Sequence, residues 1–372
     1  MCIRDRARII SPWKVEIDGR QVSAEKIILA TGASPIIPPI PGLADTDPLT
    51  SENLWQLQTL PKRLLIMGGG AIGCAMAQAF QRLAAQVILV DAMPQLLPRE
   101  DADMVARVTK TLLDEGVQII TNGEITAFTA QGPEHCAFIS GSDGNQLTVE
   151  FNRVLVAVGR CANTSGFGLE ELGVATNDNG TVAVDQFLRT SCPTIFAAGD
   201  VAGPYQLTHA AGHQAWFAGV NALFGQFKKF AVDYRVMPQV IFIDPQFARV
   251  GLNELEASEQ GIEVEVTVYD LSDLDRAIAD GDANGMVKVL TAAGTDRILG
   301  AAIIGPQAGE LITEYVTAMK YNFGLNKILA TIHSYPTLSE ANKYVAGEWK
   351  RKHVPEWLLH WVAKYYRWKL GR

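Results

Sequence analysis

The sequence has few cysteines and no long apolar run. Its five cysteines are scattered through 372 residues, and no two of them form a C-x-x-C or similarly close pair. An odd number of separated cysteines excludes a disulfide-stapled scaffold and favours a reducing compartment. No apolar run reaches the roughly 18 residues of a membrane-spanning helix, and no secretory signal follows the charged start. These absences predict a cytoplasmic protein without a transmembrane helix.

The chain also has fewer basic than acidic residues, 32 Lys and Arg against 40 Asp and Glu. The formal net charge is -8, so the chain as a whole has no general attraction for nucleic acid, and no nucleic-acid partner is expected. The sequence suggests no metal site. With 48% apolar residues over 372 positions, the chain is long enough for two or three domains that each bury a core.

Two parts of the sequence share a hairpin-plus-strand pattern. Alternating apolar and polar residues flank Asp18-Gly19, and the run 26–30 follows as a buried strand. The segment 137–160 repeats this order around the turn Asp143-Gly144. The repeat suggests two related nucleotide-binding domains.

Between these two parts lies a proline-rich segment and then a regular alternation of strands and helices. Six prolines within 34–61 indicate a crossover between domains rather than part of a core. The alternation is typical of a parallel sheet with helices on both faces. Its expected elements are a strand at 64–67, a turn at 68–73, a helix at 75–83, a strand at 87–90, a helix at 101–115 and a strand at 117–120.

The turn at 68–73 has the glycine spacing of a dinucleotide-binding site. Gly68 allows a sharp bend, Gly70 allows the backbone to approach a pyrophosphate, and Gly73 allows close packing of helix and strand. The helix that follows directs its amides and positive dipole end at the phosphates. An acid at the end of the second strand would bind the adenine ribose and repel a 2′-phosphate, which favours NAD over NADP. The predicted NAD-binding residues are Gly68, Gly69, Gly70, Ala71, Ile72, Gly73 and Asp91.

Four further motifs stand in the order expected of one family. They are Ile27-Ile28-Leu29-Ala30-Thr31-Gly32, Ala157-Val158-Gly159-Arg160, Ile195-Phe196-Ala197-Ala198-Gly199-Asp200 and Phe242-Ile243-Asp244-Pro245. With them the chain, over about 9–350, resembles the flavin-dependent pyridine nucleotide-disulfide oxidoreductases, the group of dihydrolipoamide dehydrogenase, glutathione reductase and mercuric reductase. The resemblance implies an α/β fold with two related nucleotide-binding domains, for FAD and for NAD, and a C-terminal α+β dimerisation domain.

The resemblance divides the chain into six parts. They are a partial FAD domain at 1–33, the crossover at 34–61, an NAD(P)-binding domain at 62–159, the second part of the FAD domain at 160–232, a dimerisation domain at 233–348 and a basic aromatic tail at 349–372.

The resemblance also implies which residues contact the flavin. Gly32 would close the first half of the FAD domain, and Gly159 closes the matching run of the second unit. Asp200 would hydrogen-bond the ribityl chain, and His209 and Ala210 would lie along the isoalloxazine edge. For Asp200 a helix N-cap is the alternative, and for His209 a structural role.

Two features of the family are absent from this sequence. The family begins with its own glycine-rich turn for FAD and a redox-active C-x-x-x-x-C pair, and the sequence contains neither. We therefore interpret the chain as an N-terminally truncated copy with an incomplete FAD part and impaired disulfide reduction. Ala75 also stands where members commonly carry a Glu near the nicotinamide.

The segment from His333 to Glu340 matches the family's catalytic His-Pro-Thr motif, but Tyr335 replaces the His. A phenol with a pKa of about 10 cannot shuttle protons at neutral pH as an imidazole does. The predicted catalytic set is His333, Tyr335 and Glu340. A structural or dimer-contact role stays open for His333, and Tyr335 could instead donate a hydrogen bond to a substrate or metal ligand. No cysteine follows Cys192 to serve as a mercuric reductase's C-terminal pair.

The tail at 349–372 reverses the charge balance of the chain, with seven Lys or Arg against one acid. Its aromatic residues recur at helical spacing and predict a helix after Pro355 with one aromatic face: Trp357, Trp361, Tyr365 and Trp368. Such a face beside basic residues suits a membrane interface, which would give peripheral membrane contact through 355–372. The alternative is a helix packed on the protein's own surface.

Two functions follow from these patterns. The first is an FAD-dependent oxidoreductase that passes hydride from NAD(P)H through flavin to a disulfide or related small-molecule acceptor. It would act as a homodimer through 233–348, where Gly305, Gly309 and Glu310 match the dimerisation signature. The second is a non-catalytic remnant that binds NADH and dimerises without bound flavin.

Overall fold

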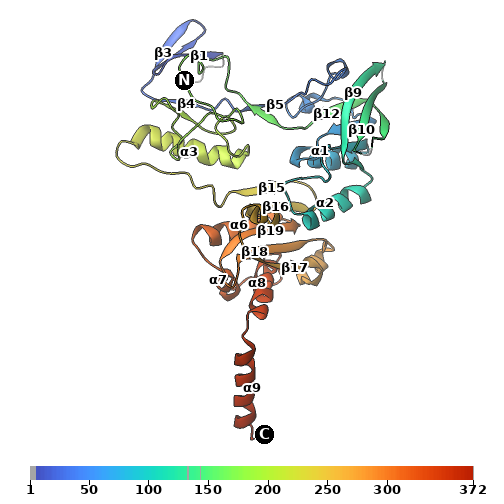
Figure 1. The fold of residues 1–372 in the computed structure, drawn as a ribbon, viewed down its shortest axis with the longest axis vertical. Coiled ribbons are helices and arrows are strands. Elements are labelled where there is room, and N and C mark those ends of the chain that lie inside the picture. The colour runs from blue at the N-terminus through green and yellow to red at the C-terminus, as the bar shows by residue number, and fades with distance from the viewer. Residues whose placement is uncertain (1–5, 132–133, 143, 372) are drawn as a thin grey trace. The chain divides into compact units, whose positions relative to one another are not determined.

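The computed structural model describes residues 6–131, 134–142 and 144–371 (Figure 1). The chain divides into two compact units. The first comprises Met1–Gly73, Leu83–Ala92 and Gln118–Tyr234, and the second comprises Cys74–Arg82, Met93–Val117 and Arg235–Arg372. The sequence boundaries proposed for the family domains cut the chain at other places, because α2 and most of α1 fall with the second unit.

The first unit opens with the predicted hairpin. Strands β1 (Ala7–Ser11), β2 (Lys14–Ile17) and β3 (Arg20–Ser23) form an antiparallel sheet, and β4 (Ile27–Leu29) then pairs in parallel with β14 (Ile195–Ala197). Asp18 and Gly19 both have positive φ, 49° and 70°, as the tight hairpin turn requires. The expectation of a buried strand at 26–30 is wrong for Ile28, which is 42% exposed.

The second hairpin-plus-strand part is present as well. Strands β9 (Gly123–Gln131), β10 (Glu134–Gly141) and β11 (Gln146–Phe151) form an antiparallel sheet, and β12 (Arg153–Val156) then pairs in parallel with β6 (Arg63–Met67). Asp143 of the predicted turn lies outside the described residues. Both parts therefore place a three-stranded antiparallel sheet before a short strand that joins a parallel pair.

The predicted alternation of strands and helices gives a four-stranded parallel sheet in the order β12-β6-β7-β8. Helix α1 (Ala71–Arg82) connects β6 to β7 (Gln86–Val90), and α2 (Ala102–Asp114) connects β7 to β8 (Gln118–Ile120). Three central residues of β6, Leu64, Leu65 and Ile66, are completely buried. Helix α1 begins at Ala71 and not at 75, so the turn is shorter than predicted.

The proline-rich segment 34–61 is more than a crossover. It contains β5 (Ala33–Pro35), which pairs with β13 (Arg160–Ala162), and two single turns of 3-10 helix, Ala44–Thr46 and Leu54–Gln56. The expectation that it contributes nothing to a core is wrong, because Leu43 is 1% exposed and packs in one hydrophobic cluster with Leu65 and Phe128. Proline interrupts regular hydrogen bonding, but it does not prevent neighbouring side chains from being buried.

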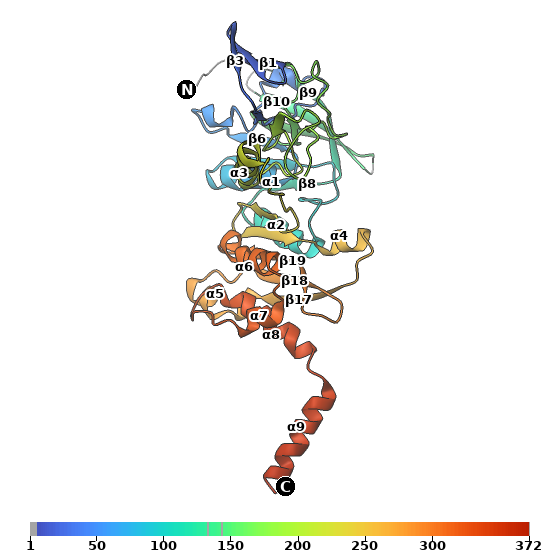
Figure 2. The same cartoon turned by 90° about the vertical axis from the view of Figure 1, so that its left-hand side faces the viewer.

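The second unit contains a five-stranded antiparallel sheet in the order β15-β16-β19-β18-β17. The strands are Pro238–Ile241, Gln246–Gly251, Ile298–Gly305, Met286–Ala292 and Val264–Asp270 in that order. Helices α6 (Ala308–Lys320) and α8 (Glu340–Lys352) contact this sheet, as Figures 1 and 2 show. The sheet and helices share one hydrophobic core. The short apolar runs of this part of the sequence predict four of these strands, at 240–243, 263–269, 285–290 and 299–304, but not β16.

The other helices are short or lie near the ends of these units. They are α3 (Thr208–Phe224), α4 (Glu254–Glu259), α5 (Asp275–Asp280), α7 (Leu325–Ala330) and α9 (Glu356–Lys369), with a 3-10 turn at Leu271–Asp273.

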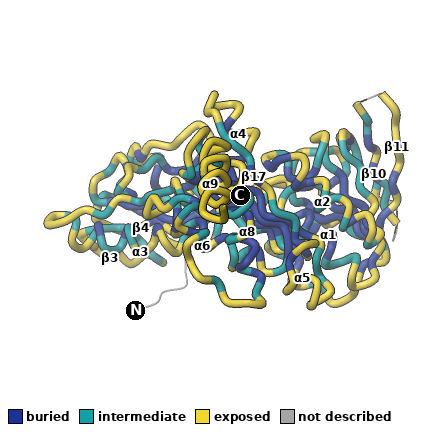
Figure 3. The backbone as a smooth tube through the Cα atoms, turned by 90° about the horizontal axis from the view of Figure 1, so that it is seen from below, coloured by how far each residue is buried: buried dark blue, intermediate teal, exposed yellow. Residues whose placement is uncertain are grey.

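Helix α9 is the helix predicted after Pro355. None of its residues is buried, and in Figure 3, which views the helix nearly end-on, it is drawn mostly in the colour of exposed residues. The rings of Trp361 and Tyr365 stack with centroids 5.9 Å apart, so part of the predicted aromatic face is formed. The alternative in which this helix packs on the protein's own surface is therefore not realised. Nor, in the described part of the chain, is any helix sufficiently long and apolar to cross a bilayer.

The burial of Leu43 gives a direct test of the corrected crossover. Replacing it with alanine removes apolar contacts from a filled core, so Leu43→Ala should lower the free energy of unfolding by about 2–5 kcal/mol. Leu60 lies on the same segment but is 46% exposed, so Leu60→Ala is the matched control and should change stability by less than about 0.5 kcal/mol. Chemical denaturation measures both, and equal effects would contradict a core role for the segment.

Candidate functional site

The glycine-rich turn between β6 and α1 depends on three glycines for three different reasons. Gly68 has φ +105°, and a Cβ there would lie 2.5 Å from the carbonyl oxygen of Ala157. A Cβ on Gly73 would lie 1.8 Å from the carbonyl oxygen of Gly68, so strand and helix can approach only without it. A Cβ on Gly70 would meet nothing within 4 Å. The first and third glycines are required by the fold, whereas Gly70 faces open space that a ligand could enter.

Asp91, at the end of β7, is bonded to this turn. Its carboxylate accepts a hydrogen bond from the backbone N–H of Gly69 at 2.5 Å. Its own backbone N–H donates to Ile120 at 2.9 Å, and its carbonyl oxygen accepts from Gly123 at 3.0 Å. The predicted acid and the predicted turn therefore meet, and backbone bonds on both sides of Asp91 fix its position.

This arrangement has the chemistry of a dinucleotide site. Ala71 and Ile72 are the first two residues of α1 and are exposed, so the first amides of the helix lie where a pyrophosphate could bind. A carboxylate at the neighbouring strand end can accept hydrogen bonds from a ribose diol and disfavours a second phosphate there. The residues present thus fit a nicotinamide dinucleotide.

The residues predicted at the flavin lie in the first unit. Gly32 and Gly159 follow β4 and β12, and both have positive φ, 68° and 129°. Arg160 lies 3.6 Å from the Asp200 carboxylate through its Nε. Asn163, which sequence reasoning missed, donates from its side chain to the carbonyl oxygen of Thr31 at 2.9 Å and so holds the loop before Gly32.

The alternative interpretation of Asp200 as a helix N-cap is wrong. Helix α3 begins at Thr208 and its N-cap is Leu207, so no helix starts at Asp200. His209 is exposed in the first turn of α3, where a ligand can reach it. Ala210 is completely buried, so its position does not support the flavin contact predicted for it.

Gln214 is a second residue that sequence reasoning missed. Its side chain is completely buried in α3 and accepts a hydrogen bond from the backbone N–H of Gly199 at 2.6 Å. It also donates to the carbonyl oxygen of Gly203 at 2.8 Å and to the Tyr234 hydroxyl at 2.7 Å. Gln214 thus fixes the loop that carries Asp200. The signal that could have found Gln214 is its place in the sequence: it recurs with Ala210, Ala218 and Asn221 at helical spacing. These four are the residues that α3 buries, and a buried polar side chain needs hydrogen-bond partners.

The three predicted catalytic residues near the C-terminus each bind a different partner. His333 Nε2 lies 3.0 Å from the Glu314 carboxylate, and Tyr335 donates from its hydroxyl to Asp275 at 3.1 Å. Glu340 accepts a hydrogen bond from the backbone N–H of Thr337 at 3.1 Å and is 7% exposed. The structure therefore does not bring the three side chains together in one hydrogen-bond network.

These contacts distinguish the roles of His333 and Tyr335. The His333 side chain is only 6% exposed, and its Nδ1 lies 3.1 Å from the carbonyl oxygen of Thr331, so both ring nitrogens are engaged and a structural role is favoured. Tyr335 is 69% exposed. The hydrogen bond to Asp275 raises the pKa of Tyr335 above its ordinary value, so the phenol stays protonated at neutral pH and can donate a hydrogen bond but not take up a proton.

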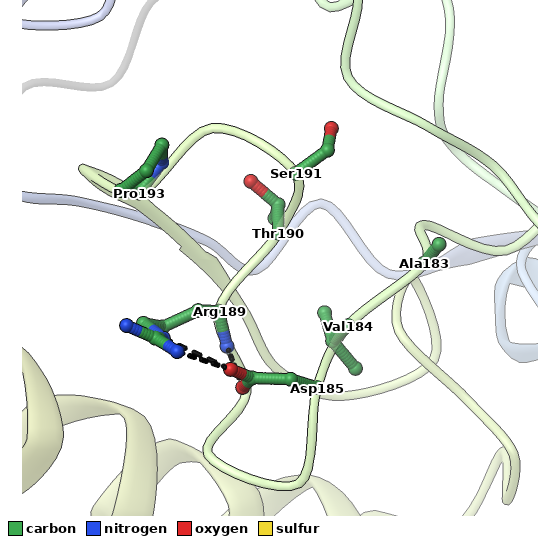
Figure 4. A pocket seen from close by; sticks show the side chains of 7 residues that line it. All are labelled: Ala183, Val184, Asp185, Arg189, Thr190, Ser191 and Pro193. Carbon is green, nitrogen blue, oxygen red and sulfur yellow. Dashed lines mark hydrogen bonds and ion pairs between the residues drawn. The ribbon is translucent and has the colours of Figure 1, made fainter.

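A cavity of about 420 Å³ in the first unit is separate from these residues (Figure 4). Arg189 and Asp185 point toward one another across it and are 2.8 Å apart. Each of these charged groups neutralises the other, and the lining includes none of the predicted site residues. It is lined by Ala183, Val184, Asp185, Arg189, Thr190, Ser191 and Pro193.

Two glycine substitutions in the turn distinguish an effect on folding from an effect on NADH binding. Gly73→Ala puts a Cβ against the Gly68 carbonyl oxygen, so we expect a lower melting temperature together with lost NADH binding. Gly70→Ala meets no protein atom, so its melting temperature should match the unaltered chain while NADH affinity falls by about tenfold. Thermal unfolding and NADH fluorescence titration measure the two effects. Unchanged affinity in Gly70→Ala would contradict the proposed approach of the pyrophosphate.

Comparison with known proteins agrees with this arrangement. Residues 2–215 match the family model of the pyridine nucleotide-disulphide oxidoreductases, and residues 237–346 match the dimerisation domain of the same family. A dihydrolipoyl dehydrogenase of Thermus scotoductus is 36% identical over 346 residues, which are 91% of this chain and 73% of that protein. A mercuric reductase of Streptomyces lividans is 36% identical over 325 residues, or 87% of this chain and 68% of that protein.

Solved structures give the same result. The HOCl-induced flavoprotein disulfide reductase RclA from Escherichia coli superposes with a TM-score of 0.84 at 30% identity, covering 93% of this chain and 78% of that one. LpdA from Mycobacterium tuberculosis superposes with a TM-score of 0.82 at 27% identity, covering 92% of this chain and 75% of that one. The chain belongs to the pyridine nucleotide-disulphide oxidoreductase family, whose members are FAD-dependent oxidoreductases that use NAD(P)H.

Proposed function

We propose that this chain binds NADH at the turn 68–73 and Asp91 and delivers its hydride through FAD to a disulfide or related small-molecule acceptor. The observation that carries the proposal is the bond between the Asp91 carboxylate and the Gly69 N–H, in a turn whose Gly70 faces open space. The negative charge of Asp91 favours NADH over NADPH. The reaction class, hydride transfer through FAD, is inferred from membership of the family. The chain would work as a homodimer through 233–348.

The flavin side of the site would use residues of the first unit. We assign the ribityl contact to Asp200, whose loop is fixed by Gln214, and an edge contact to the exposed His209. Gly32 and Gly159 provide the left-handed backbone at the ends of their strands. FAD, when bound, supplies the redox chemistry, and these residues bind and orient it.

In the C-terminal segment we assign the acceptor contact to Tyr335. Its exposed hydroxyl, kept protonated beside Asp275, would donate a hydrogen bond to the bound acceptor. Glu340 would hold the turn through Thr337, and His333 would stabilise the segment through Glu314. A tyrosine that only donates a hydrogen bond differs from the family's catalytic His, which moves protons. The acceptor therefore has to be one whose reduction needs no proton from this position.

A second candidate function has a specific observation in its favour. Ala210, which the sequence predicted along the flavin edge, is completely buried and so offers the flavin no surface. The second candidate is a chain that binds NADH and dimerises but performs no flavin chemistry.

Reconstitution with FAD separates the two candidates. The purified full chain is incubated with FAD, desalted and mixed with NADH without oxygen. We expect flavin absorbance to remain after desalting and to fall on NADH addition. Asp200→Ala should lose flavin but keep NADH binding, and Gly70→Ala should show the reverse. A colourless protein that still binds NADH would support the second candidate.

We further propose that α9 makes peripheral contact with an anionic membrane. Trp357, Trp361 and Trp368 are 71%, 60% and 76% exposed, and basic residues follow them on the same tail. Aromatic rings suit the headgroup layer, and lysine and arginine are attracted by anionic lipid.

Vesicle flotation tests the membrane contact. The full chain should float with vesicles that contain an anionic lipid and should be released by high salt, because surface charge attraction is screened. A variant without 355–372 should stay at the bottom of the gradient. Equal flotation of the two proteins, or flotation of neither, would contradict the contact.

A further inference from the structure

A second, smaller cavity of the first unit has a basic lining. Its volume is about 110 Å³, and its lining includes Lys26 just before β4, Arg189, and Lys229 beyond the end of α3. Among the described residues that line it there is no carboxylate. The whole chain has a net charge of -8, so three cations around one small cavity reverse the charge locally. Such a lining attracts an anion.

Two of these three cations are uncompensated. Arg189 donates from its Nε and Nη2 to the Asp185 carboxylate at 2.9 Å and 2.8 Å, so that pair is neutral. In the part of the chain that the structure describes, neither Lys26 nor Lys229 has a carboxylate partner. The Lys229 ammonium lies 5.4 Å from the centroid of the Phe187 ring, which also lines the cavity. The cavity therefore keeps two positive charges for a ligand.

A buried amide holds the walls of the basic cavity. Asn221 of α3 is 5% exposed and is part of the lining. Its side chain donates to the carbonyl oxygens of Phe187 at 3.1 Å and Phe230 at 2.8 Å, and it accepts from the N–H of Phe230 at 2.8 Å. The N–H of Val232 also donates to the carbonyl oxygen of Gln186 at 3.0 Å. The two chain segments on either side of the cavity are thus tied together by satisfied bonds.

The basic cavity adjoins the larger one of Figure 4, because Arg189 and Pro193 line both. The larger cavity, of about 420 Å³, is in the range of roughly 300–1,000 Å³ of small-molecule sites, whereas the basic cavity alone is below it. The larger lining is mixed, with the apolar side chains of Ala183 and Val184 and the hydroxyl of Thr190. All residues that line the two cavities belong to the first unit.

Charge and size together indicate the class of ligand. A phosphate monoester carries about -1.5 to -2 charges at neutral pH, which matches the two uncompensated lysines. A carboxylate or a sulfate ester carries only one negative charge. The small cavity has room for the charged group, and the adjoining larger cavity has room for the organic part of the same molecule.

We propose that the two adjoining cavities form a binding site for a small phosphate monoester, in which Lys26 and Lys229 hold the phosphate. Its organic part extends past Arg189 into the larger cavity. None of the lining residues belongs to the sets proposed above for NADH, for FAD or for the acceptor. The site is therefore additional to the proposed function and does not rest on it.

Phenyl phosphate is a suitable probe, because it joins a phosphate to a small organic group. In titration calorimetry the full chain should bind one phenyl phosphate. Phenyl sulfate, of similar shape but with one negative charge, should bind about tenfold more weakly, as the loss of a charge-assisted hydrogen bond allows. Inorganic phosphate, which leaves the larger cavity empty, should also bind more weakly.

These titrations can contradict the proposal in three ways. Lack of phenyl phosphate binding, or equal Kd values for phenyl phosphate and phenyl sulfate, would overturn the site. Inorganic phosphate that binds as tightly as phenyl phosphate would overturn the part assigned to the larger cavity.

Lys228 and Lys229 provide a matched pair of variants. Both are exposed, and their ammonium groups lie over the rings of Phe230 at 5.1 Å and Phe187 at 5.4 Å, but only Lys229 lines the cavity. Lys229→Gln and Lys26→Gln should each raise the Kd for phenyl phosphate about tenfold. Lys228→Gln should leave it unchanged. Equal weakening by Lys228→Gln and Lys229→Gln would show general charge attraction and overturn the site.

Two controls exclude binding of the probe at the glycine-rich turn. Gly70→Ala should keep its affinity for phenyl phosphate, and Lys229→Gln should keep the NADH affinity of the unaltered chain. Loss of phenyl phosphate binding in Gly70→Ala would place the probe at the turn and overturn the proposal. Thermal unfolding checks that each variant is folded.

Discussion

The hydrogen bond from the Gly69 N–H to the Asp91 carboxylate is the interaction on which the candidate site depends. It joins the turn after β6 to the end of β7. The turn itself needs glycine at 68 and 73, because a Cβ at either position would clash with a backbone carbonyl, of Ala157 or of Gly68. The same bond places one negative charge beside the first turn of α1. The positive helix end and the acid that the proposed NADH site requires are thus brought together by a few backbone positions.

Buried polar side chains hold the loops of this molecule in place. Gln214 fixes the loop of Asp200 from inside an apolar helix stripe, and Lys288 fixes the start of α2 from inside a β-strand. Each would be costly to bury without partners, and each has partners only when its loop is in one position. The polar groups therefore specify loop geometry more than they add stability.

Local patterns predicted most of the fold. Period-two alternation around Asp18-Gly19 and glycine spacing in the turn depend on short-range backbone sterics, which a sequence displays directly. What the sequence could not predict depends on tertiary partners. The burial of Leu43, the strand β16 and the separate partners of His333 and Tyr335 all involve residues distant in sequence, and no local pattern encodes those contacts. Asp91 was found because its spacing from the turn is itself local.

The central claim is that Asp91 selects and holds the nicotinamide cofactor at the turn 68–73. The most direct measurement is the Kd of the full chain for NADH and for NADPH, compared with Asp91→Asn. The account predicts tighter binding of NADH in the unaltered chain and a smaller preference in the variant, since the charge that repels a 2′-phosphate is gone. An identical ratio of the two Kd values in both proteins would contradict it.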